Sequence, residues 1–261
     1  WPGSVVVKNG ALLWGQYKNL SGIIAMPPEP GKDLAMSIRE YPLNGVSTVL
    51  LSAQTPGQPF FSADGSSIVA DAQQQMQHNL DVVNGLDMLP IVVLFDPACK
   101  LANAKAYEAA ALTFVKAFSK ENWFLLCIAD RCDDSAFGDG ITLARSVAEA
   151  VHKEDAKQIL AAGAASADAN KKLLAGNSAI EAIVARAASS GSAVAGVGAP
   201  AVEIVDAKAL SGDAMKSAVN KALGAEHIGF AVADGTQVAS LLPNIFDGVD
   251  AYQKATFTAM P

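Results

Sequence analysis

The chain has 261 residues, of which 51% are hydrophobic and 17% are charged, and its formal net charge is −7. One hydrophobic core can serve up to about 250–300 residues, so we expect a single domain spanning residues 1–261. The acidic balance and the lack of a Lys/Arg cluster argue against a nucleic-acid partner, and no apolar run reaches the roughly 18 residues of a membrane span.

The chain opens with two apolar runs joined by Asn9-Gly10, a dipeptide that favours a type I′ turn. We therefore expect an N-terminal β-hairpin formed by residues 4–8 and 11–15.

After the hairpin, strand-like and helix-like runs alternate, which is the pattern of parallel βαβ units. The expected strands are 22–26, 46–52, 90–96, 123–130, 158–163, 192–197, 201–206 and 227–234, and the expected helices are 33–41, 71–86, 104–120, 142–153, 167–189, 213–223 and 236–252. This order predicts an α/β fold, a (β/α)8 barrel of the TIM type. Only residues 198–200 separate the sixth and seventh strands, so either the sixth crossover helix is missing or the sixth strand is misplaced.

Four of the expected strands end in an aspartate: Asp96, Asp130, Asp206 and Asp234. Barrel enzymes carry their catalytic groups at the carboxyl ends of the strands, so these four side chains would converge on one rim. Convergent carboxylates raise one another's pKa, which is how acid/base sites are tuned. For each aspartate taken alone, the alternative role is to cap a helix or fix a turn.

Several segments resemble the cellulase- and mannanase-type barrel glycoside hydrolases. They are Phe60-Phe61-Ser62-Ala63-Asp64-Gly65, the helix with Asn79-Leu80-Asp81 that leads into residues 85–94, the helix at 109–120 that leads into strand 123–130, and residues 152–157 leading into 158–163. The resemblance covers roughly residues 46–170. It implies a barrel whose fourth and seventh strands each end in a catalytic glutamate.

The chain departs from this family at the catalytic positions. The fourth strand of the family ends in Asn-Glu, where this chain has Asp130-Arg131, so Arg131 or, with a shift of one residue, Asp130 takes the place of the glutamate. Asp206 stands at the nucleophile position, and Asp234 stands where the family has a sugar-binding Trp. Aspartate is shorter than glutamate, so an Asp pair suits the wider carboxylate spacing of an inverting enzyme better than that of a retaining one. Alternatively, Arg131 pairs with Asp130 or Asp206 and removes the general acid.

Two functions follow from these departures. The favoured one is a glycoside-hydrolase-like barrel without activity, which binds carbohydrate or has a structural role. The alternative is an active glycosidase with Asp130 as acid and Asp206 as its partner, and with Asp96, Arg131 and Asp234 in contact with substrate. Phe60 and Phe61 would stack against a sugar ring or, in the alternative interpretation, pack into the core and anchor their loop. A phosphate-handling barrel is disfavoured, because few basic residues are expected at the rim.

Cys99 and Cys132 follow adjacent expected strands, so a disulfide between them is sterically reasonable. It would imply an oxidising compartment, hence a secreted or periplasmic protein; the alternative is two unrelated thiols. No CxxC pair occurs and no histidine lies at the carboxyl end of a strand, so we expect neither a metal site nor a cofactor.

Overall fold

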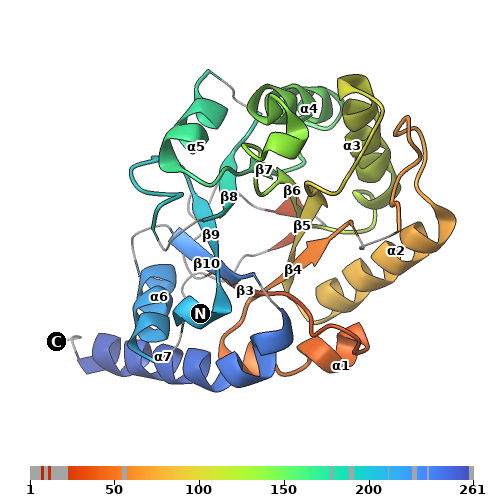
Figure 1. Ribbon diagram of the computed structural model, residues 1–261. Helices are drawn as coiled ribbons and strands as arrows, with labels where there is room; N and C mark the ends of the chain where they lie inside the picture. Colours follow the sequence, from red (N-terminus) through yellow and green to blue (C-terminus); the bar gives the residue numbers. More distant parts are fainter. Residues whose placement is uncertain are drawn as a thin grey trace.

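The computed structural model describes residues 7–8, 11–12, 23–54, 58–176, 179–187, 191–210, 212–224, 228–233 and 235–258. Eight parallel strands close into a barrel in the order β10-β3-β4-β5-β6-β7-β8-β9, and the helices surround it (Figure 1). The strands are β3 (Ile24–Met26), β4 (Thr48–Ser52), β5 (Leu89–Phe95), β6 (Leu125–Ala129), β7 (Leu160–Ala162), β8 (Ala182–Arg186), β9 (Ala201–Val205) and β10 (Ile228–Val232).

The helices lie between the strands in the chain and outside them in space. They are α1 (Leu34–Ile38), α2 (Ala70–Gly85), α3 (Ala104–Phe118), α4 (Gly140–Glu154), α5 (Ala167–Leu174), α6 (Asp213–Leu223) and α7 (Val238–Thr258), with short 3-10 turns η2 (Pro42–Asn44), η3 (Ser135–Phe137), η4 (Ala207–Leu210) and η5 (Gly235–Gln237). The predicted TIM-type α/β barrel is therefore confirmed. None of the helices among the described residues combines the length and the apolar character needed to span a bilayer.

The N-terminal hairpin is confirmed in the part that the structure describes. β1 (Val7–Lys8) pairs antiparallel with β2 (Ala11–Leu12), with Val7 opposite Leu12 and Lys8 opposite Ala11. The other residues of the predicted hairpin lie outside the described ranges.

Side chains alternate between two cores along the strands, as the period of a β-strand requires. Ile91 and Val93 of β5 and Leu125 of β6 point into the barrel, where they form one buried cluster with small and branched side chains from the other strands. Their neighbours Val92 and Leu126 point outward into the larger cluster beneath the helices. Mostly apolar strands with both faces buried are what a closed parallel barrel demands.

The predicted sixth strand, 192–197, is wrong. The strand is β8, which lies inside the predicted helix 167–189; helix α5 ends at Leu174, and residues 191–196 form turns. The alanine-rich sequence has a high helix propensity, but pairing between β7 and β9 overrides it. The described part of the connection from β8 to β9 contains no helix either. The sixth strand was therefore misplaced, and a sixth crossover helix is also absent from the described residues.

Candidate functional site

The most distinctive polar cluster lies where β6 and β8 end. Asp130 follows β6 directly and is only 3% exposed. Its Oδ2 accepts a hydrogen bond from Nε of Arg186 at 3.1 Å and forms an ion pair with Nη2 of the same residue at 2.9 Å. Arg131 lies on the other side, with its Nε 3.9 Å from Asp130 Oδ1. The pairing of Asp130 with Arg131, one of the two sequence alternatives, is thus present, but the stronger partner is Arg186.

The backbone around the short strand β7 brings these side chains together. The N–H of Arg186 donates to the carbonyl of Asp130 at 2.9 Å, which ties the ends of β6 and β8 to each other. Gly163 follows β7, and a Cβ on it would lie 2.0 Å from the carbonyl oxygen of Val184. Only glycine fits this close approach, so Gly163 helps to place Arg186 against Asp130.

Two of the other predicted aspartates fix turns. Asp96 Oδ1 accepts hydrogen bonds from the N–H groups of Ala98 and Cys99, at 2.8 and 3.1 Å. Asp206 is exposed, and its Oδ1 accepts from the N–H of Lys208 at 2.9 Å, at the start of η4. Both carboxylates thus stabilise a turn, which was the role weighed against catalysis. Asp234 lies outside the described residues.

Phe60 and Phe61 are each only 4% exposed. The ring of Phe60 packs 5.9 Å from that of Phe114 on α3, and the ring of Phe61 lies 6.1 Å from that of Phe95. Both therefore anchor their loop in the core, and neither ring offers the open face that stacking on a sugar requires.

Two cavities with both polar and apolar walls flank this loop at the carboxyl ends of β4 and β5. The larger, of about 290 Å³, is lined by Gln54, Gln58, Asp96 and Lys100 among others. The smaller, of about 220 Å³, includes Ser52, Gln75 and Asn79 in its wall, and the two share Gln58, Pro59 and Phe60. Small-molecule pockets hold roughly 300–1,000 Å³, so each cavity could take one small polar group.

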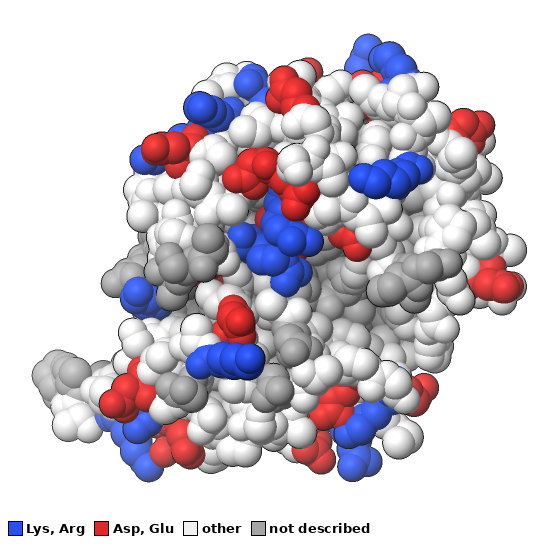
Figure 2. Space-filling view, in the orientation of Figure 1, with Lys and Arg blue, Asp and Glu red and all other residues white. Residues whose placement is uncertain are grey.

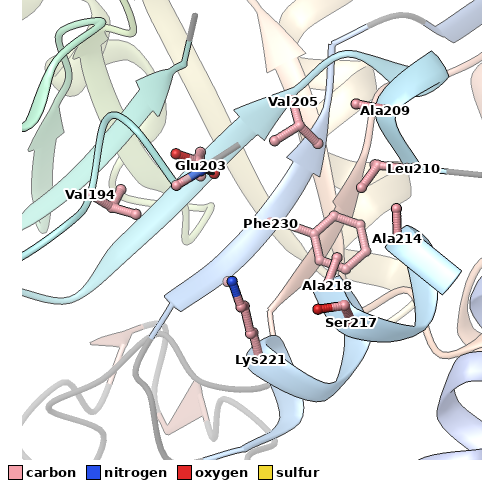
Figure 3. Close-up of a pocket in the computed structure, with 12 residues that line it drawn as sticks. Val194, Glu203, Val205, Ala209, Leu210, Ala214, Ser217, Ala218, Lys221 and Phe230 are labelled. Atoms are coloured by element: carbon pink, nitrogen blue, oxygen red, sulfur yellow. Dashed lines mark hydrogen bonds between the residues drawn. The ribbon is translucent and has the colours of Figure 1, made fainter. Parts of the chain in front are cut away.

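A third cavity, of about 190 Å³, lies on the outside of the barrel, beside the crossover from β8 to β9, which has no helix in its described residues 187 and 191–200 (Figure 3). Figure 3 shows Phe230 and Leu210 in its wall, with Lys221 and Ser217 contributed by α6. Glu203 of β9 is 5% exposed, and its Oε2 and Oε1 accept from the N–H groups of Gly191 and Ala193, at 2.7 and 3.3 Å. This cavity is removed from the strand ends, so we assign it no part in the rim site.

The predicted disulfide is not formed, because Cys99, Cys127 and Cys132 are all free thiols. Burial raises the pKa of Cys99 to about 11 and that of Cys132 to about 12. Thiols of this kind are poor nucleophiles at neutral pH. The expectation of an oxidising compartment depended on that disulfide and loses this support.

The charge on the barrel face is unevenly distributed. Figure 2 shows Lys and Arg side chains gathered near the middle of the face, with Asp and Glu side chains beside them. Among the described residues, no group of three or more His, Cys, Asp or Glu side chains is placed to hold a metal ion.

No family model and no curated protein sequence matches the chain. Among solved structures, it is similar to a β-1,4-D-mannanase from Cryptopygus antarcticus, with 15% identity, a TM-score of 0.55 and 82% of each chain covered. It is also similar to the exo-β-1,4-mannosidase Op5Man5 from Opitutaceae bacterium strain TAV5, with 10% identity and a TM-score of 0.54; the match covers 93% of this chain and 58% of that one. The resemblance to barrel glycoside hydrolases is therefore confirmed at the level of the fold.

The same barrel also appears in a protein of other chemistry. A putative vitamin-B12-independent methionine synthase from Listeria monocytogenes matches with 10% identity, a TM-score of 0.50 and 85% of each chain covered. A shared barrel does not imply a shared reaction, so function has to be argued from the rim.

Proposed function

We propose that this protein is a non-catalytic relative of the barrel glycoside hydrolases that binds a saccharide at its rim without cleaving it. The observation that carries the proposal is the state of Asp130, the carboxylate that takes the acid/base position of the family if the match is shifted by one residue; without the shift, Arg131 stands there. Its Oδ2 already accepts an N–H hydrogen bond from Arg186 Nε and pairs with Nη2 of the same guanidinium group, and its Oδ1 faces Arg131. A general acid has to present a proton to the leaving group, whereas this carboxylate is engaged as an acceptor in a buried ion pair.

The second carboxylate required for hydrolysis is also engaged elsewhere. Asp206 accepts the N–H of Lys208 and begins η4. A retaining or inverting pair needs two carboxyl groups free to face the scissile bond. Asp130 is not free in this sense, and one oxygen of the exposed Asp206 is engaged in its turn, which favours the inactive form over an active glycosidase.

Binding, by contrast, has support in the cavities of the rim. Gln54 and Gln58 line the larger cavity beside Asp96, at the carboxyl ends of β4 and β5, and β5 is next to β6. Amide groups donate and accept hydrogen bonds together, which matches the hydroxyl groups of a sugar. The carboxyl ends of barrel strands are where this fold places its ligands.

The test measures binding and turnover on the same panel of soluble glucans, mannans and xylans. We expect retardation of the protein in affinity gels and no release of reducing sugar. Gln58→Ala, a change in the cavity wall, should weaken the binding, whereas Gln74→Ala on the exposed surface of α2 should leave it unchanged.

Two outcomes would overturn the proposal. Hydrolysis that is lost in Asp130→Asn would establish the active glycosidase instead. Absence of binding to every glycan would leave the structural role, the other part of the favoured hypothesis.

A further inference from the structure

We infer that Arg131 and Arg186 form a subsite for an oxyanion, a carboxylate or a sulfate ester, carried by the saccharide. This inference deepens the proposed function and depends on it. It starts from a residue that the sequence placed inside a helix: Arg186 is the last residue of β8, so its side chain stands at the rim.

The two arginines outnumber the carboxylate that they share. Asp130 brings one negative charge, and Arg131 and Arg186 bring two positive charges within 3.9 Å of it. The cluster therefore keeps one positive charge in excess, in a chain whose formal net charge is −7. The neighbouring Asp133 and Asp134 are not ion-paired with these arginines; they accept the N–H groups of Ala165 and Ala136 and keep their own negative charge, so the excess belongs to the three-residue cluster.

The arginines also remain accessible. The side chains of Arg131 and Arg186 are 40% and 33% exposed, whereas that of Asp130 is 4% exposed. A ligand that approaches the rim would meet the guanidinium groups before the carboxylate beneath them. Figure 2 shows Lys and Arg side chains near the middle of this face, within the ring of helices.

Arg131 has an unused donor. Its buried Nε has no hydrogen-bond partner within the described part of the chain, since Asp130 Oδ1 is 3.9 Å away. A buried donor without a partner is costly. Because this Nε is covered, a ligand oxygen would meet the exposed part of the Arg131 side chain, which is 40% exposed. The planar guanidinium group matches the geometry of a carboxylate or sulfate with two parallel hydrogen bonds, which a neutral sugar cannot provide as strongly.

The experiment compares polymers that differ only in charge. The probes are polygalacturonate against its methyl ester, and dextran sulfate against dextran, each measured with the full chain by affinity electrophoresis. We expect the charged member of at least one pair to bind at least about tenfold more tightly than its neutral counterpart, the size of one strong charge-assisted contact. The pair that shows the difference identifies the anion as a carboxylate or a sulfate.

The matched variants are Arg131→Gln and Arg39→Gln. Arg39 also stands beside an acidic neighbour in the sequence, 3.7 Å from Glu40, but it lies at the end of α1, outside the rim cluster. Arg131→Gln should abolish the preference for the charged polymer, and Arg39→Gln should keep it. Because loss of Arg186 would strand the buried carboxylate of Asp130, Arg186 is tested in the double variant Asp130→Asn/Arg186→Gln, which should also lose the preference.

The outcomes separate this inference from the proposed function. Equal binding of charged and neutral polymers, or equal behaviour of the Arg131 and Arg39 variants, overturns the oxyanion subsite while saccharide binding stands. If no polymer binds, the proposed function fails, and a titration with sodium sulfate followed through the NMR signal of the Arg131 Nε–H decides the subsite itself. A saturable shift supports the subsite, and an unmoved signal overturns it.

Discussion

Two loops of this barrel each have a carboxylate among the groups that hold them, one exposed and the other buried. On the side covered by α2 and α3, Asp64 Oδ1 accepts from the hydroxyl and the N–H of Ser66 and from the hydroxyl of Ser62, at 2.7–3.1 Å. On the side without a crossover helix, the carboxylate of Glu203 binds the N–H groups of Gly191 and Ala193. In both loops a carboxylate accepts hydrogen bonds from backbone N–H groups, but Asp64 is exposed to solvent whereas Glu203 is buried.

That difference matters because water can replace the partner only in the exposed case. If Asp64 is removed, its serines can hydrogen-bond to solvent. If Glu203 is removed, the N–H groups of Gly191 and Ala193 lose their acceptor, and Ala193 is fully buried. A lost partner in such a place costs the desolvation of the donor as well as the bond.

Glu203→Ala is expected to have the largest effect. Hydrogen bonds to a charged group contribute about 1.5–3 kcal/mol each, so the free energy of unfolding should fall by about 3 kcal/mol. Urea denaturation measures it, with Glu203→Gln as a variant that keeps one acceptor oxygen and should lose less. A loss no greater than that in the exposed-site control Glu121→Ala would show that the helix-free crossover is held by something else.

Asn170 gives the next largest effect, since it holds the same turn from the other side. This fully buried side chain accepts the N–H of Ala164 and donates to the carbonyls of Ala164 and Ala193. Asn170→Ala should cost about 2 kcal/mol, from three neutral hydrogen bonds at about 0.5–1.5 kcal/mol each, offset in part by solvent. Hydrogen exchange of residues 191–193 should accelerate in both this variant and Glu203→Ala.

Because Glu203 and Asn170 meet at Ala193, their variants should also be non-additive. A coupling of more than about 0.5 kcal/mol in the double mutant would be consistent with a shared turn. Strict additivity would contradict the view that the two side chains act on one structural unit.

The sequence predicted some strands of the barrel and missed another. Strands β5 and β6 were found because an apolar run of seven or eight residues, bounded by a helix and an aspartate, has few other interpretations. β8 was missed because Ala182–Arg186 lies in alanine-rich sequence, where helix propensity is high. The cue was local: Gly176-Asn177-Ser178 is a turn signal that should have ended the helix, and Ile183-Val184 is a β-branched pair.

The missed strand had a direct consequence for the site. Placing Arg186 in a helix hid the partner of Asp130, so the sequence could offer only Arg131 to pair with it. Asp130 itself was found because it ends a clear strand. The turn roles of Asp96 and Asp206 depend on where the next backbone N–H groups point, which residue types alone do not determine.

The smallest effect is expected at Asp64, and it should be visible mainly as a dependence on pH. Its hydrogen bonds to Ser62 and Ser66 lower the pKa of the carboxyl from 3.8 to about 2. A lowered pKa in the folded state means that Asp64 stabilises the fold above pH 4 and that this contribution is lost as the pH falls towards 2.

Since the carboxylate is exposed, Asp64→Asn should change stability at pH 7 far less than Glu203→Ala. An NMR titration of the Asp64 side-chain carboxyl carbon should give a midpoint near 2, well below the ordinary value of 3.8. A midpoint at the ordinary value would mean that the serine contacts do not hold in solution, and the contrast between the exposed and the buried carboxylate would then rest on Glu203 alone.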